Sequence, residues 1–291
     1  MFSGSIPALV TIFRDEALDA RAYRDFCAWQ VSEGSAALVP CGTTGESATL
    51  TGAEHRQCIE LAVEAAAGRV KVLAGCGSNN TAHAIELTRA AKDAGADAAL
   101  HVPPYYNRPN QEGIYAHIAA IAEAVDLPIM LYNVPSRTVT DIAVETMARL
   151  GELPAVIGVK DATGNLARVS AQRLACGADF IQLSGNDDMA LGFNAVGGIG
   201  CISVTANVAP RLCADFQAAC AEGRWSDALA LQDRLYPLHA ALFTDASPGP
   251  VKYALSRVHG GFSSDLRLPM TPPSQASRHA VDAALAHAGR I

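Results

Sequence analysis

The chain has 291 residues, half of them hydrophobic, which is enough for a large buried core in one or two domains. Its formal net charge of −7 and the lack of any basic run argue against nucleic acid as a partner. No basic leader precedes a long apolar stretch, and no segment is apolar for long enough to cross a bilayer, so we expect a cytoplasmic protein without membrane contacts.

Short apolar segments alternate along the chain with longer segments whose apolar residues recur every three or four positions, as in repeated β-α units. The pattern predicts eight strands, at residues 8–13, 36–41, 70–76, 98–102, 128–133, 156–161, 180–185 and 198–204. Clear helical periodicity between them covers residues 53–67, 82–94, 112–124 and 141–150. Eight nearly continuous apolar strands separated by helices predict an α/β fold, a (β/α)₈ TIM barrel. A doubly wound sheet is the alternative, but its glycine-rich fingerprint after the first strand is missing.

A helical tail follows the eighth predicted strand, and it is longer than the single helix that a barrel needs. Helical periodicity covers residues 208–221, 225–243, 251–258 and 274–288, and no low-complexity linker separates them from the barrel. We therefore predict a barrel domain over residues 1–224 and a C-terminal helical extension over residues 225–291 that packs on it.

The eight cysteines and eight histidines are scattered and form no metal-binding motif. We interpret most cysteines as buried, reduced thiols. Cys41 directly precedes a glycine-rich turn that belongs to the predicted active site, although a packing role is still favoured for it. We expect no bound metal.

Polar residues at the carboxyl ends of barrel strands are the candidates for chemistry, because active sites of this fold form there. Lys160 is the strongest candidate, since it follows four apolar residues within the sixth predicted strand. Burial favours the neutral amine of a lysine, which is the form that attacks a ketone. The other interpretation is a solvated strand end at which Lys160 pairs with Asp161, and both remain open on this strand alone.

Two further strand ends supply groups that suit a small carboxylic acid. The turn at residues 42–45 offers the hydroxyls of Thr43 and Thr44 and accessible backbone N–H groups. Tyr132 could move a proton and Thr43 could relay it, and Arg137 could bind a carboxylate with two hydrogen bonds. Each has an ordinary alternative, namely a tight turn, a packed aromatic ring and a solvated arginine. Their convergence on one face of the predicted barrel favours a site.

Distinctive motifs are spread over most of the chain, namely Gly42-Thr43-Thr44-Gly45-Glu46, Pro104-Tyr105-Tyr106-Asn107-Arg108-Pro109, Tyr132-Asn133-Val134-Pro135-Ser136-Arg137-Thr138, Gly158-Val159-Lys160-Asp161-Ala162-Thr163-Gly164-Asn165, Ile202-Ser203-Val204-Thr205-Ala206-Asn207, Pro250-Val251-Lys252 and Leu268-Pro269-Met270-Thr271-Pro272. Through these motifs the chain resembles the dihydrodipicolinate synthase family nearly from end to end. Asp161 replaces a glutamate that often follows the lysine, a small change.

The resemblance implies a lyase that condenses pyruvate with L-aspartate-4-semialdehyde, giving 4-hydroxy-tetrahydrodipicolinate for the diaminopimelate and lysine pathway. Lys160 would form a Schiff base with pyruvate, so no metal, nucleotide or other cofactor would be needed. The other implied site residues are the pyruvate carboxylate ligands Thr43 and Thr44, the proton relay Tyr132, Thr43 and Tyr106, the semialdehyde ligand Arg137, and the pocket-lining Gly185 and Ile202. Tyr106 would enter a neighbouring subunit's site, which implies a homo-oligomer, usually a tetramer built as a dimer of dimers.

Other functions remain open beside this one. Sister aldolases, among them N-acetylneuraminate lyase and 2-keto-3-deoxy sugar acid aldolases, share the barrel, the lysine and the tyrosine. The arginine in Ser136-Arg137-Thr138 suits an aldehyde with its own carboxylate, whereas sugars call for neutral hydroxyl partners. A non-catalytic barrel that binds a carboxylate and a metal-dependent pyruvate aldolase are alternatives of other classes.

The resemblance also implies an allosteric lysine pocket, with departures. Its candidate residues are Ser47, Ala48, His55, Asn79, His83 and Tyr105. His83 stands where lysine-sensitive members carry a glutamate that binds the effector's amino group, and Gly52 replaces a histidine. Loss of a charge-assisted hydrogen bond costs about 1.5–3 kcal/mol, so we predict weak or absent inhibition by lysine.

Overall fold

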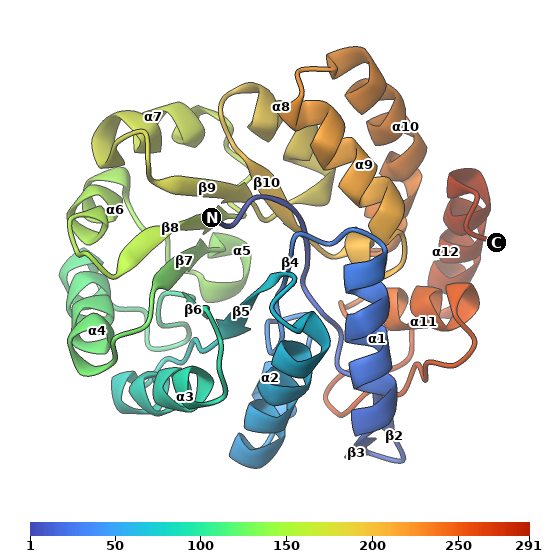
Figure 1. Cartoon of the computed structure of the whole chain (residues 1–291), viewed down its shortest axis with the longest axis horizontal. Helices are drawn as coiled ribbons and strands as arrows, with labels where there is room; N and C mark the ends of the chain where they lie inside the picture. The colour runs from blue at the N-terminus through green and yellow to red at the C-terminus, as the bar shows by residue number, and fades with distance from the viewer.

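A computed structural model of residues 1–291 shows eight parallel strands arranged in a ring, with the N-terminus near its centre in projection (Figure 1). The strands follow the order β1-β10-β9-β8-β7-β6-β5-β4. The ring closes where Val39 N donates to Pro7 O (3.1 Å) and Leu9 N donates to Val39 O (3.0 Å). This confirms the predicted (β/α)₈ barrel. The barrel strands are β1 (Gly4–Pro7), β4 (Ala37–Leu38), β5 (Lys71–Gly75), β6 (Ala98–His101), β7 (Ile129–Asn133), β8 (Val156–Asp161), β9 (Ile181–Ser184) and β10 (Gly200–Ser203).

Helices surround the barrel and continue beyond it. Those between or after the strands are α1 (Ala20–Ser32), α2 (Gly52–Ala66), α3 (Thr81–Asp93), α4 (Gln111–Ala124), the short α5 (Pro135–Thr138), α6 (Val144–Gly151), α7 (Ala167–Cys176), α8 (Ala190–Ala195) and α9 (Pro210–Ala221). The C-terminal ones are α10 (Trp225–Ala241), α11 (Gly249–Val258) and α12 (Gln275–Ala288). Local sequence sets their starts: at α2, Thr51 Oγ1 accepts from Glu54 N and the Glu54 carboxylate accepts from Thr51 N, a capping box.

The first strand lies earlier than predicted. We expected it at residues 8–13, whereas β1 covers Gly4–Pro7 and a small hairpin, β2 (Phe13–Arg14) and β3 (Ala17–Leu18), follows. Past Ala8 the side chain of Asn207 replaces a neighbouring strand: its Oδ1 accepts from Val10 N (2.9 Å) and its Nδ2 donates to Ala8 O (2.8 Å). The segment is apolar because it is buried beside α1, not because it belongs to the sheet.

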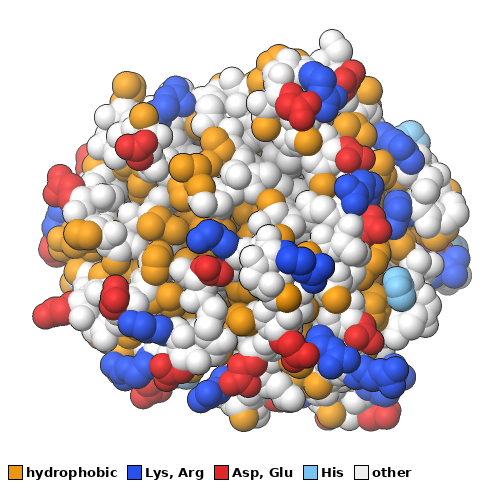
Figure 2. All heavy atoms as spheres, in the orientation of Figure 1, with side chains coloured by type: hydrophobic (Ala, Val, Ile, Leu, Met, Phe, Trp, Pro, Cys, Tyr) orange, Lys and Arg blue, Asp and Glu red, His pale blue; other side chains and the backbone are white.

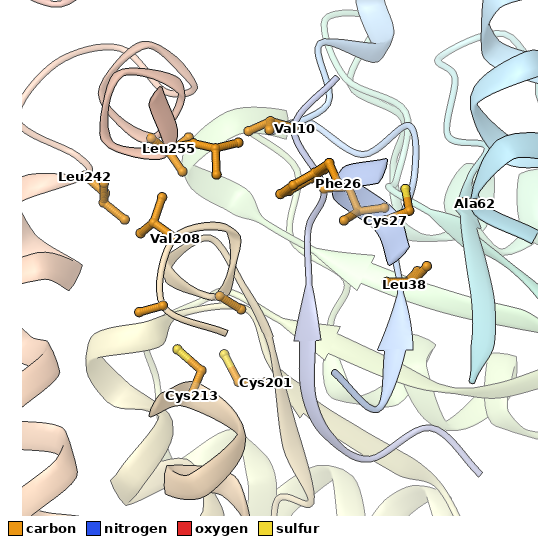
Figure 3. Close-up of a cluster of buried hydrophobic side chains, with 14 of the residues drawn as sticks. Val10, Phe26, Cys27, Leu38, Ala62, Cys201, Val208, Cys213, Leu242 and Leu255 are labelled. Atoms are coloured by element: carbon orange, nitrogen blue, oxygen red, sulfur yellow. The ribbon is translucent and has the colours of Figure 1, made fainter. Parts of the chain in front are cut away.

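The hydrophobic core divides into the barrel interior and two outer clusters. The interior contains Ile6, Leu73, Met130 and Ile202. The largest cluster joins the barrel to the C-terminal helices, and Figure 3 shows Phe26 of α1 facing Val208, Leu242 and Leu255 from the C-terminal third of the chain. The predicted helical extension therefore shares a continuous core with the barrel, and the boundary at residue 225 stays a prediction.

No helix is long and apolar enough to cross a membrane. On the face drawn in Figure 2, acidic and basic side chains alternate around the rim, and hydrophobic side chains are exposed between them. No charge of one sign dominates this face.

Two buried histidines should make the fold sensitive to acid. Burial lowers the pKa of His101 to about 3 and that of His117 to about 4. Both are neutral in the folded protein at neutral pH, whereas in the unfolded chain they bind protons below about pH 6.5. Because the unfolded state then binds more protons, the free energy of unfolding should fall between about pH 6.5 and pH 4. The expected slope is up to about 1.4 kcal/mol per pH unit for each histidine.

Thermal unfolding between pH 7 and pH 4 measures this dependence. We expect His101→Gln to flatten the decline of the melting temperature and the exposed His279→Gln to leave it unchanged. Equal slopes for the wild type and His101→Gln would contradict a role for His101.

Candidate active site

Lys160 lies near the carboxyl end of β8 with its side chain in the barrel interior. Only 6% of the residue is exposed, and no carboxylate lies within ion-pair distance of its Nζ. The Nζ is 4.0 Å from the centroid of the Tyr132 ring, which occupies the paired position on β7. The barrel therefore holds a buried amine against a phenol, with no neighbouring carboxylate to fix its charge.

Asp161 does not pair with Lys160. Successive residues of a strand point to opposite faces, and the Asp161 carboxylate points away from the interior, where it accepts from Thr163 Oγ1 (2.6 Å) and Gln172 Nε2 (2.9 Å). Arg168 Nε lies 3.5 Å from the same carboxylate. The interpretation of Lys160 as one half of a surface ion pair is therefore wrong.

Gly185, directly after β9, leaves room for Lys160. A Cβ at this position would lie 3.2 Å from Lys160 Cε and 2.7 Å from the Cβ of Ala162. A gap of 2.7 Å is too short for two carbon atoms, so any larger residue would displace the lysine or its strand. Ile202, on the next strand β10, is fully buried in the barrel interior.

The turn at residues 41–46 follows β4 and brings two threonines to the same end of the barrel. It begins and ends with residues in the left-handed region, Cys41 (φ 57°) and Glu46 (φ 53°). Thr43 is exposed and Thr44 is buried. Gly75 allows the turn to approach β5, because a Cβ there would lie 2.1 Å from Cys41 O.

A cavity of 780 Å³ opens at this end of the barrel and is lined by Thr43, Tyr132 and Arg137. Arg137 belongs to α5, is exposed and forms no ion pair. Its guanidinium is free to bind an anion in two hydrogen bonds. Hydroxyl groups and an unpaired cation thus meet around one cavity. Lys160, Thr44, Gly185 and Ile202 are not among its lining residues, and Lys160 lies next to it through the Tyr132 ring.

Tyr106 does not join the other predicted residues within this chain. The residue is 91% exposed, and its backbone lies in the left-handed region (φ 67°). A bulky residue held in that conformation is strained, which points to a role outside the chain's own packing.

Most residues of the predicted allosteric pocket line the same cavity. These are Ser47, Ala48, His55, His83 and Tyr105, whereas Asn79 is not among the lining residues. The imidazole of His83 is exposed, with its Nδ1 3.3 Å from the Glu86 carboxylate. A Cβ at Gly52 would meet nothing within 4 Å, so this part of the wall is open.

His55 and Cys41 are uncharged at neutral pH. Burial lowers the pKa of His55, whose Nε2 donates to Gly75 O (2.7 Å). Burial raises the pKa of the Cys41 thiol, whose Sγ donates to His55 O (3.5 Å). A protonated thiol is a poor nucleophile, so Cys41 acts here as a packing residue.

Residues from the C-terminal extension form part of the cavity wall, a contribution that the sequence pattern did not indicate. They are Phe243, Asp245, Ala246, Ser247, Pro248, Pro269 and Met270. Pro269 and Met270 belong to the motif at residues 268–272, and the motif at residues 250–252 lies close to Pro248 in sequence, so these two motifs were the available signal.

Comparisons with known proteins agree with this geometry. A model of the dihydrodipicolinate synthetase family matches residues 1–288. A relative from Rhizorhabdus wittichii, named 4-hydroxy-tetrahydrodipicolinate synthase, is 67% identical over 289 residues, 99% of each chain. The structure of a chloride-inhibited dihydrodipicolinate synthase from Acinetobacter baumannii, complexed with pyruvate, matches with a TM-score of 0.97 at 42% identity over 100% of both chains. A monomeric dihydrodipicolinate synthase variant matches with a TM-score of 0.97 at 35% identity, over 100% of this chain and 98% of the variant.

Proposed function

Because the chain belongs to the dihydrodipicolinate synthetase family, we propose that it has the activity for which its curated relatives are named, that of a 4-hydroxy-tetrahydrodipicolinate synthase. This lyase reaction condenses pyruvate with L-aspartate-4-semialdehyde. The observation that carries the proposal is the buried, unpaired Lys160 beside Tyr132, at the barrel end where the cavity opens.

In the proposed first step, the neutral amine of Lys160 attacks the ketone carbon of pyruvate. The carbinolamine loses water to form a protonated Schiff base, and Tyr132 and Thr43 move the protons that this exchange requires. Thr43 and Thr44 receive the pyruvate carboxylate. Gly185 and Ile202 form the wall behind it. The positive Schiff base withdraws electrons from the methyl group, so loss of a methyl proton gives an enamine, and neither metal nor nucleotide is needed.

In the second step the enamine carbon attacks the aldehyde carbon of L-aspartate-4-semialdehyde, and the aldehyde oxygen takes up a proton. Arg137 binds the carboxylate of this substrate. The substrate's amino group then attacks the Schiff base carbon, closes the ring and releases Lys160 as a free amine. Location in the cytoplasm remains a prediction.

The test is a coupled assay. Purified protein is given pyruvate and L-aspartate-4-semialdehyde, and product is followed through nicotinamide oxidation by a dihydrodipicolinate reductase. Turnover supports the proposal. Capture of pyruvate by borohydride without turnover would instead favour a sister aldolase, to be examined with 2-keto-3-deoxy sugar acids and N-acetylneuraminate. Failure to capture pyruvate would favour a non-catalytic barrel, and activity lost on chelation would favour a metal-dependent aldolase.

We further propose that Tyr106 completes the proton relay in a neighbouring subunit, within a tetramer built as a dimer of dimers. The exposed, strained Tyr106 supports an intermolecular role. Tyr106→Phe should lower kcat by about 10²-fold, the usual contribution of a proton-transfer group. Mixing Tyr106→Phe subunits with Lys160→Ala subunits should restore activity, because some mixed dimers contain one intact site. A mixture as inactive as its components would contradict the shared site.

Inhibition by lysine should be weak. His83 has an imidazole at the position where, by the family resemblance, lysine-sensitive members carry a carboxylate. Its Nδ1 also lies 3.3 Å from the Glu86 carboxylate. We expect His83→Glu to strengthen lysine inhibition about tenfold or more, equivalent to about 1.5 kcal/mol. The measurement is the inhibition constant for lysine in the coupled assay, with the exposed His279→Gln as control. Strong inhibition of the wild type would contradict the prediction.

A further inference from the structure

A fully buried ion pair links the active-site turn to the C-terminal extension. Lys252 Nζ on α11 donates to Glu46 Oε1 at 2.7 Å, and the side chains are 0% and 1% exposed. The second carboxylate oxygen accepts from the backbone N of Arg267 (3.1 Å). The Lys252 Nζ also lies 4.5 Å from the centroid of the Phe13 ring. Glu46 is therefore held from two points of the extension.

The same region is clamped from a third direction by the Arg267 side chain. Its guanidinium donates to Thr49 O (3.0 Å) and to the Glu54 carboxylate (2.9 Å). It also lies 4.2 Å from the centroid of the Phe13 ring, the ring that Lys252 contacts. Glu54 in turn caps α2. The segment from residue 46 to the start of α2 is thus held by Lys252 and Arg267, which lie more than 200 positions later in the sequence.

Glu46 is hydrogen-bonded directly to Thr43 of the site. Glu46 N donates to Thr43 O (3.1 Å), and Glu46 itself occupies the left-handed conformation that ends the turn. A non-glycine residue stays in that conformation only when its surroundings hold it there. Glu46 also lines the cavity, so without Lys252 its carboxylate would place an uncompensated negative charge in the wall of a site that receives an anion.

We propose that the Glu46–Lys252 pair is a positioning element of the active site, which holds the Thr43–Thr44 turn in the conformation that binds the keto acid carboxylate. This inference rests on the proposed function for its substrate. The C-terminal extension would then fix the conformation of the substrate-binding turn, although neither Glu46 nor Lys252 touches the reacting atoms.

The test compares Lys252→Met, Glu46→Gln and the double variant with two controls. Arg257→Met removes a cation from the same helix, where it pairs with Asp282 on the surface. Leu285→Ala removes buried packing in the extension away from the turn. Each single variant should lose about tenfold to 10²-fold in kcat/KM for pyruvate, mainly through KM, as for a small displacement of binding groups. The fold-loss of kcat/KM in the double variant should be smaller than the product of the two single fold-losses, because the double variant leaves no unpaired buried charge.

Hydrogen exchange of a peptide covering residues 41–50 gives a readout that needs no substrate. It should quicken in Lys252→Met and stay at the wild-type rate in Arg257→Met and Leu285→Ala. If a single variant does not fold, the double variant carries both measurements. The proposal would be overturned if the folded variants kept the wild-type KM for pyruvate and the wild-type exchange rate of residues 41–50. It would also be overturned if KM rose in one single variant and fell in the other, because that result indicates an effect of charge on the substrate and not of turn conformation. A wild type that captures no pyruvate, with faster exchange in Lys252→Met, would refute the proposed function and leave the positioning role supported.

Discussion

Replacement of Lys160 by alanine is expected to abolish turnover and the capture of pyruvate together. No other lysine lies in the barrel interior beside Tyr132, so no second amine can form the Schiff base. The loss in kcat should be at least about 10³-fold, as for removal of other covalent nucleophiles. The variant should stay folded, because the deleted amine has no ion-pair partner that would be left uncompensated.

The measurement combines the coupled assay with mass spectrometry after treatment with pyruvate and borohydride. Lys92→Ala is the matched control, since it removes a lysine that forms only a surface pair with Asp126 (3.7 Å). Pyruvate captured as efficiently by Lys160→Ala as by the control would show that another residue is the nucleophile.

Replacement of Gly185 by alanine is the second large expected effect. The added methyl group would lie 2.7 Å from Ala162 Cβ and 3.2 Å from Lys160 Cε, so the lysine must shift. A displacement of a reacting group by about 1 Å costs on the order of 10²-fold, and we expect that loss in kcat/KM for pyruvate.

Gly260→Ala is the control for this substitution, because a Cβ at Gly260 meets no atom within 4 Å. The rate of Schiff base formation, followed by quenching with borohydride at increasing times, separates the lysine step from later ones. A rate in Gly185→Ala equal to that of the control would show that the site relaxes around the methyl group without moving Lys160.

The sequence allowed the barrel and its candidate nucleophile to be predicted for a physical reason. Lys160 interrupts an apolar strand, and a buried charge is conspicuous in any pattern of hydrophobicity. The first strand was misplaced because residues 8–13 are as apolar as a strand, yet they are buried by α1 and bonded by Asn207. Hydrophobicity reports burial and does not distinguish which neighbour provides it.

Other parts of the site carry no such signal. Gly185 has no side chain, and its closeness to Lys160 depends on how β8 and β9 lie side by side. Without the family resemblance nothing in the sequence singles it out. Lys252 and Glu46 are 206 positions apart, and each alone resembles a solvent-exposed charge on a helix or turn. Such long-range contacts are set by the folded structure and cannot be read from local patterns.

The closure of the barrel has a consequence for how the protein is made. Gly4 of β1 pairs with Gly200 of β10, and Glu46 meets Lys252. At a synthesis rate of 5–20 residues per second, Glu46 waits about 10–40 s for its partner. The sheet of the nascent chain keeps an open edge until β10 is made, and Glu46 stays solvated until Lys252 follows. A ribosome-bound fragment that ends before residue 252 therefore carries Lys160 but lacks the buried support of the turn that faces it.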